Sequence, residues 1–473
     1  MLKKTIALFL CLVFVFGLVA CGKNGDIGSG LGSSLDSQVQ SGTMSQPSES
    51  KIDDDTKITP SSSTPTPSAP SGSLGNTELG SEEVDDNIVI EDTDTDDIDN
   101  SVNVVTSHTA LSSDKYYQYS CLTSAEKQVY NVLASAAKNA DNIIDLKSYN
   151  VNKDLLGKIF TAVITDNPQY FWVTNTYSYG YRGDDGRATY IILYYTDGTK
   201  MDEINNETLE AVNLADRSKI QTQIAEFNAG AKAVLDNISP SLSPVEKERK
   251  IHDYILKNTS YDSATANSYS GTGASPHPSF NAYGALVKNS AVCMGYAELF
   301  QYLCYQVGIN VTQITGETSV AHMWSCVQLD NKWYHVDVTW DDASSNGYPI
   351  YEYFNVTEAQ ISRDHIIDNI DASVPEANST EYSFDNVFGM RVASVLEAPQ
   401  NYQNAMDYIL ENGEKYIIVN LNGNTVDNAY LRSHFIGNGS TVRKYAASKG
   451  YNISLAYGYI TIGNYLYLII EWE

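Results

Sequence analysis

Three short blocks in the middle of the chain decide its fold: residues 290–297 read SAVCMGYA, residues 320–329 read VAHMWSCVQL, and residues 332–339 read KWYHVDVT. The first block is followed by an apolar run with helical spacing, which predicts a helix that begins near Cys293. The other two blocks flank the turn dipeptide Asp-Asn at 330–331, and they predict the strands of an antiparallel hairpin. We therefore expect one α+β unit that carries both the helix and the hairpin.

Cys293, His322 and Asp337 follow one another in these blocks and form a candidate catalytic triad. The positive end of a helix favours a thiolate at Cys293, and the N–H groups of its first turn can stabilise an oxyanion. Folding the hairpin brings Asp337 level with His322. His322 would then take the thiol proton, and Asp337 would fix the tautomer of its ring. His335 shares a strand face with Asp337 and could compete as the base, but its place in the chain makes it the poorer partner.

Residues 291–298, 321–324 and 333–342 together resemble the core of the transglutaminase-like superfamily. By this resemblance Cys293 is the nucleophile, His322 the base and Asp337 the orienting acid. The resemblance implies a papain-like α+β fold in which the cysteine helix packs on an antiparallel sheet. Members of the superfamily include amide crosslinkers, peptidases, deamidating enzymes and catalytically silent modules, so the resemblance does not fix the reaction.

Three aromatic residues, Tyr283, Trp324 and Trp340, are candidate substrate-binding residues, although Tyr283 also fits a core position. Asp341 and Asp342 close the second strand, either as a turn with surface acids or as a wall of the substrate groove. The chain contains no CxxC or HxxxH spacing, so the sequence predicts no metal site and no cofactor.

The other cysteines of the expected folded region are Cys121, Cys304 and Cys326. An extracellular compartment would permit disulfides, and the sequence does not choose among the pairings. Cys304 lies on the expected cysteine helix and favours a core position. Cys326 lies on the expected strand and fits either the core or a disulfide.

The N-terminus has the pattern of an export signal. Lys3 and Lys4 precede a 16-residue apolar run at 5–20, which is too short to span a bilayer. Residues 18–22, LVACG, resemble the lipobox of bacterial lipoproteins, which implies that Cys21 carries a lipid. An ordinary signal peptide with an incidental cysteine is the alternative. We expect residues 1–21 to be a signal peptide, and the protein to be held on the extracellular face of a bacterial membrane by the lipid alone.

Residues 22–112 are rich in Ser, Thr, Pro and Asp, and carry 17 acidic residues against three lysines. Such a segment buries too little apolar surface to fold, so we expect a disordered tether. The whole chain has 473 residues and a net charge of −28. This balance argues against nucleic acid as a partner, because phosphate binding needs a basic patch. The expected partners are protein or peptide substrates, including cell-wall or surface proteins.

The remaining residues are expected to form three parts. Residues 113–260 are expected to form the N-terminal helical and strand part of the catalytic region, and residues 261–375 the transglutaminase-like core. Residues 376–473 predict a small α+β accessory domain that ends in a hairpin around 463–464. The site predicts a thiol enzyme that acts on amide or peptide bonds through a thioester, as a protease, amidase or transglutaminase. The alternatives are a silent binding or adhesion module at the cell surface and a wall-assembly scaffold.

Overall fold

The computed structural model describes residues 77–83, 104–183, 185–196, 215–268, 277–342, 350–368, 372–388, 390–391 and parts of 403–472. The predicted signal peptide, Cys21 and the first part of the predicted tether lie outside these residues. Among the residues that are described, no helix is long and apolar enough to cross a bilayer.

The site-bearing sheet is antiparallel throughout, with the strand order β10-β7-β8-β9. Its strands are Ile366–Ile367 (β10), Asn310–Glu317 (β7), Ala321–Leu329 (β8) and Lys332–Val336 (β9). The predicted hairpin between β8 and β9 is confirmed. Asp330 and Asn331 both have positive φ, 47° and 62°, as the two-residue turns that suit twisted strands require. β9 ends at Val336, three residues earlier than expected. The reason is that the Asp337 carboxylate accepts the backbone N–H groups of Thr339 and Trp340 and so forms a turn.

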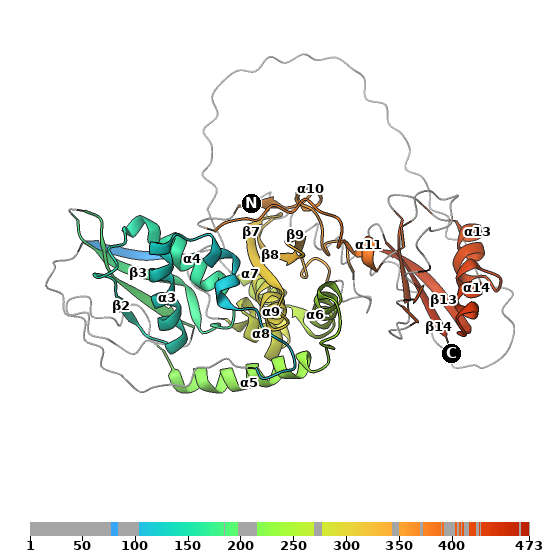
Figure 1. Cartoon of the computed structure of the whole chain (residues 1–473), viewed down its shortest axis with the longest axis horizontal. Helices are drawn as coiled ribbons and strands as arrows, with labels where there is room; N and C mark the ends of the chain where they lie inside the picture. Colours follow the sequence, from blue (N-terminus) through green and yellow to red (C-terminus); the bar gives the residue numbers. More distant parts are fainter. Residues whose placement is uncertain are drawn as a thin grey trace, which may run out of the picture. The chain divides into compact units, whose positions relative to one another are not determined.

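Helix α9 (Cys293–Gln306) begins at the predicted residue and packs against β7 and β8 (Figure 1). Its other neighbours are α8 (Ala282–Val287) and α6 (Pro244–Asn258), the latter with a proline in its first turn. Gly295 permits the close approach of a neighbouring segment, since a Cβ there would lie 2.8 Å from the Ser279 carbonyl oxygen. The sequence of α9 thus fixes both where the helix starts and what lies against its first turn.

A second sheet has the order β1-β3-β4-β2. Its strands are Thr77–Glu83 (β1), Val173–Tyr181 (β3), Ala188–Tyr195 (β4) and Ile143–Asp145 (β2). The prediction of a disordered tether over 22–112 is wrong at β1, which pairs in parallel with β3, and at Leu111, whose N–H bonds the Tyr305 carbonyl. The open backbone edge of β3 supplies partners that the composition of β1 does not reveal.

Helices and further short elements join the two sheets around one hydrophobic core. This core includes buried residues from Tyr116 to Phe388 together with Ile418, and it has members on both sides of 260, so the expected boundary there is no break in packing. The helices are α2 (Tyr117–Ser120), α3 (Ser124–Asn139), α4 (Leu156–Asp166), α5 (Arg217–Leu235), α7 (Ser263–Ser268), α10 (Glu358–Ile361) and α11 (Phe384–Val387). The strands β5 (Ser260–Tyr261) and β6 (Ser290–Ala291) form a short parallel pair just before α9.

The C-terminal part has a small sheet and a core of its own, as expected. The sheet order is β11-β12-β14-β13, and the closing hairpin joins β13 (Ile453–Ile462) to β14 (Tyr465–Trp472). The other elements are β11 (Met390–Arg391), β12 (Tyr416–Asn420), α13 (Asn428–Leu431) and α14 (Thr441–Ser448). The accessory part starts later than residue 376, because Phe384 still stacks on Tyr351 with ring centroids 3.9 Å apart.

Candidate active site

The structure brings Cys293 and His322 into contact. Cys293 is the first residue of α9, and His322 is the second residue of β8, against which that helix packs. The Cys293 side chain lies close enough to His322 to raise the pKa of its imidazole, and it packs against Ala297 and Met323. Both side chains are nearly buried, with residue exposures of 5% and 4%.

Asp337 completes the expected constellation from the turn after β9. His322 Nε2 lies 2.7 Å from Asp337 Oδ2, which leaves Nδ1 as the nitrogen for the thiol. Asp337 Oδ1 accepts the backbone N–H groups of Thr339 and Trp340 at 2.9 and 3.1 Å. The carboxylate is therefore held by its own turn while it orients the imidazole.

The electrostatics of the site favour a charged pair. Burial alone would lower the pKa of His322, but the charge and hydrogen bond of Asp337, and then the contact with Cys293, raise that pKa to about 10. Burial would likewise raise the pKa of Asp337, but His322 and His365 hold it well below its usual range. At neutral pH the site therefore holds an imidazolium against a carboxylate.

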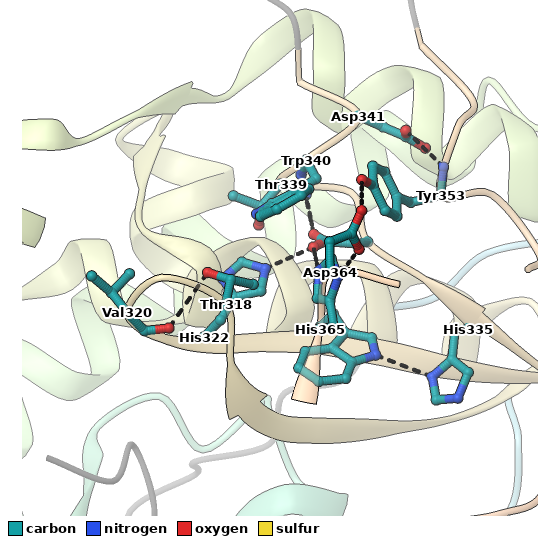
Figure 2. Close-up of polar contacts among 12 residues, drawn as sticks. Thr318, Val320, His322, His335, Thr339, Trp340, Asp341, Tyr353, Asp364 and His365 are labelled. Atoms are coloured by element: carbon teal, nitrogen blue, oxygen red, sulfur yellow. Dashed lines mark hydrogen bonds and ion pairs between the residues drawn. The ribbon is translucent and has the colours of Figure 1, made fainter. Parts of the chain in front are cut away.

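A second imidazole, which the sequence analysis missed, bonds the same carboxylate oxygen. His365 lies between α10 and β10, and its Nε2 is 3.0 Å from Asp337 Oδ2. Its Nδ1 is 2.6 Å from Oδ1 of Asp364, and the residue is 1% exposed. Figure 2 shows His322 and His365 meeting at this point from different segments. The local sequence, DHII at 364–367, holds no signal beyond a histidine before a short apolar strand.

The ligand atoms of His322, Asp337 and His365 lie within 4.8 Å of one another, which is close enough to share a cation. The two nitrogen–oxygen separations, 2.7 and 3.0 Å, are those of hydrogen bonds and account for this closeness without an ion.

The three candidate substrate-binding residues occupy different surroundings. Trp340 is 39% exposed, and its ring centroid lies 4.5 Å from that of His365 and 6.1 Å from that of His322. Trp324 is buried, and its indole N–H donates to His335 Nδ1 at 3.0 Å. Trp340 is therefore the candidate that the structure places at the open side of the triad, whereas Trp324 lies behind the imidazole.

Tyr283 has the core position that the sequence left open. It is 3% exposed, stacks on Phe171 with centroids 5.1 Å apart, and donates its hydroxyl hydrogen to Glu226 of α5. The Tyr283 hydroxyl is used inside the fold, and the Trp324 indole is buried with its N–H bonded to His335. Both residues therefore differ from the expected role as side chains presented to a substrate.

His335 is unsuited to act as the base. It is completely buried, and burial together with the charge of His365 lowers its pKa to about 4. Its Nδ1 accepts the Trp324 N–H, so the ring is neutral and turned to the interior. The expectation that it is the poorer partner for the thiol agrees with this geometry.

Asp341 is bonded to the turn that carries the triad acid, and its interpretation as a surface acid is wrong. It is fully buried, with Oδ2 3.1 Å from Nε2 of His252 on α6. Burial alone would lower the pKa of His252, but hydrogen bonds that its ring donates to Asp253 and Asp341 raise it to about 9. The backbone N–H of Asp341 also bonds the carbonyl of Asp337, which links this buried ion pair to the turn that carries the triad acid.

The four cysteines within the described residues, Cys121, Cys293, Cys304 and Cys326, are all free. Cys121 is exposed and the other three are buried. The open question of disulfide pairing among these four is thus answered: none of them is paired.

Comparisons with known proteins match part of this chain to a protein family and to curated relatives. A family model described as the transglutaminase-like superfamily matches residues 232–338. Kyphoscoliosis peptidase of Homo sapiens is 25% identical over 168 residues, which cover 31% of this chain and 24% of that protein. The Mus musculus protein of the same name is 26% identical over 156 residues, which cover 29% and 23%. The chain thus spans about a quarter of the length of these curated relatives.

Two solved structures also show similarity. One is described as a TGase, with 16% identity, a TM-score of 0.23, and coverage of 35% of this chain and 44% of that one. The other is a candidate cysteine protease from Cytophaga hutchinsonii, with 17% identity, a TM-score of 0.19, and coverage of 32% and 51%. The family match includes the cysteine helix, the histidine strand and the acid. Residues 232–338 of this chain therefore form a domain of the transglutaminase-like superfamily.

Proposed function

We propose that this protein is a thiol enzyme that acts on amide or peptide bonds of proteins, with Cys293, His322 and Asp337 as its catalytic triad. One observation carries the proposal: the Cys293 thiol contacts an imidazole whose other nitrogen lies 2.7 Å from a buried carboxylate. This is the arrangement that activates a cysteine nucleophile.

The reaction proceeds in two steps. Cys293 Sγ attacks the carbonyl carbon, and N–H groups of the first turn of α9 stabilise the oxyanion. The carbon–nitrogen bond then breaks as the His322 imidazolium gives its proton to the departing amine, which leaves a thioester on Cys293. Water or a second amine next attacks the thioester while His322 takes up its proton, and the carbon–sulfur bond breaks to release an acid or a new amide and the Cys293 thiolate.

We favour hydrolysis over amine transfer. The curated relatives carry the name peptidase. No dedicated amine site is recognisable in the sequence. The substrate class is therefore proteins or peptides that offer a carbonyl to the exposed Trp340 edge of the site.

Alkylation at pH 6 tests the nucleophile directly. Iodoacetamide should modify Cys293 of the full chain faster than Cys304 and Cys326, because burial raises the pKa of both of these thiols. His322→Ala should slow the reaction at Cys293 by about tenfold or more, since it removes the neighbouring imidazolium. Cys121 is exposed, and its rate, which His322→Ala should leave unchanged, is the internal reference.

Turnover is tested by ammonia release and new N-termini from glutamine-containing peptides. Cys293→Ala should abolish both, and Cys304→Ala, which changes a buried cysteine of the same helix, is the matched control. A Cys293→Ala protein with the parental rate would remove the enzyme proposal and favour a binding module.

The location is a separate proposal, supported by the sequence LVACG at 18–22. We propose that Cys21 is lipidated and holds the protein on the extracellular face of a bacterial membrane, where cell-wall or surface proteins would be its substrates. Cys21→Ser should move the protein from the membrane fraction to the soluble fraction, and Cys11→Ser should not. Membrane retention of the Cys21→Ser protein would contradict the anchor.

A further inference from the structure

We propose that His365 is a positioning residue of the triad, which fixes the Asp337 carboxylate and shares its negative charge so that His322 can release its proton. The inference rests on the proposed function for its catalytic consequence, but its structural content concerns only three side chains.

The Asp337 carboxylate is held at both oxygens. Its Oδ1 accepts two backbone N–H groups of its own turn, and its Oδ2 is shared by His322 at 2.7 Å and His365 at 3.0 Å. His365 arrives from a segment 28 residues further along the chain, so it fixes the carboxylate independently of that turn. Without His365, Asp337 Oδ2 would bond only the His322 ring, whose orientation it has to fix.

The charge of His365 follows from its contacts. Its Nε2 faces Asp337, and its Nδ1 lies 2.6 Å from Asp364 Oδ1. When both carboxylates are ionised they can only accept hydrogen bonds, and both ring nitrogens then carry hydrogens, which makes the ring an imidazolium. Asp364 is held in turn by the Tyr353 hydroxyl at 2.8 Å.

One carboxylate therefore serves two cationic rings, whose centroids lie 5.5 Å apart. A like charge at this distance disfavours the charged form of His322 and offsets part of the stabilisation by Asp337. This effect has the direction that catalysis needs, because His322 must give up its proton to the leaving amine.

Other titratable groups also face this site, and all of them stay unchanged when His365 is replaced. They come from α9, β9, the turn after β9 and the segment 350–368, and comprise Cys293, His335, Asp341, Tyr353 and Asp364. A comparison of variants at position 365 thus isolates the contribution of His365.

The test separates position from charge with two variants of the full chain. His365→Gln keeps a neutral N–H donor for Asp337, and His365→Leu removes the donor as well. His108→Gln, which changes a histidine that contacts the carbonyl oxygens of Leu235 and Ile238, is the matched control. The measurements are kcat and KM for peptide amide hydrolysis, and the titration of His322 followed by NMR with ¹⁵N-labelled histidine.

In both position-365 variants we expect the His322 titration to move upward by about one pH unit, because a neighbouring cation is gone. His365→Leu should in addition lower kcat by roughly 10²-fold with little change in KM, because the Asp337 carboxylate is no longer held in the orientation that positions His322. His365→Gln should keep most of kcat.

An unchanged His322 titration in both variants, or equal kcat losses that follow only their melting temperatures, would overturn the inference and leave His365 as packing. The NMR titration needs no turnover. A shifted titration in a protein that hydrolyses no peptide would therefore sustain the inference and count against the proposed function alone.

Discussion

Replacing Asp337 with asparagine changes charge but not shape, and its cost can be worked out from the contacts. An amide cannot accept hydrogen bonds from both imidazoles through its nitrogen, whereas its oxygen can still accept the two backbone N–H groups. Removal of one partner from a buried ion pair costs roughly 3–5 kcal/mol. We expect Asp337→Asn to lower the free energy of unfolding by about this amount at pH 7.

The pH dependence gives the sharper prediction. The pKa of His322 is raised in the folded protein to about 10, so the folded state binds a proton that the unfolded chain loses near pH 6.5. This contribution to stability is complete below pH 6.5 and declines by about 1.4 kcal/mol per pH unit as pH rises toward 10. The Asp337→Asn protein lacks it throughout. The stability gap between the two proteins should therefore narrow by about 3 kcal/mol from pH 7 to pH 9.

Urea unfolding at pH 7, 8 and 9 measures this gap. Tryptophan fluorescence reports on the core, because four of the five tryptophans lie in the part that contains the β10-β7-β8-β9 and β1-β3-β4-β2 sheets, namely Trp172, Trp324, Trp333 and Trp340. His252, whose pKa is also raised to about 9, contributes equally to both proteins and cancels. Asp154→Asn, at an exposed ion pair with Lys153, should produce no such gap. A gap that stays constant or widens with pH would refute the charged pair.

Two further substitutions test the placement of the helices. Gly295→Ala should lower the free energy of unfolding by about 1–3 kcal/mol and slow the alkylation of Cys293, because the new Cβ would lie 2.8 Å from the Ser279 carbonyl oxygen. Gly439→Ala is the control, because a Cβ there meets nothing within 4 Å. Equal melting temperatures of the two variants would contradict the close packing at Gly295. Thr123→Ala should lower stability by about 1 kcal/mol in urea unfolding, because its side chain and that of Glu126 form the capping box of α3, and an unchanged midpoint would show that the cap contributes nothing.

The parts of the site that the sequence predicted depend on local rules. The apolar spacing after Cys293 marks the start of α9, and the Asp-Asn dipeptide sets the register of the β8–β9 hairpin. Given that register, His322 and Asp337 meet. The same holds for α6, whose proline and capping box lie at its start.

The parts that could not be predicted depend on contacts between distant segments. His365 and His252 reach the turn after β9 only through tertiary packing, and nothing in their neighbouring residues encodes which carboxylate they bond. β1 is a strand because β3 offers a free backbone edge. Asp341 is buried for the same kind of reason, since a partner on α6 compensates its charge.

The pairing of β1 with β3 limits the distance over which an anchored enzyme could work. Only 55 residues separate Cys21 from Thr77, where the chain joins the folded body. At about 3.6 Å per residue a segment of this length can span at most roughly 200 Å, compared with roughly 330 Å had the spacer run to residue 112. With a lipid on Cys21, any protein farther from the bilayer than this shorter radius would be spared, whatever its sequence.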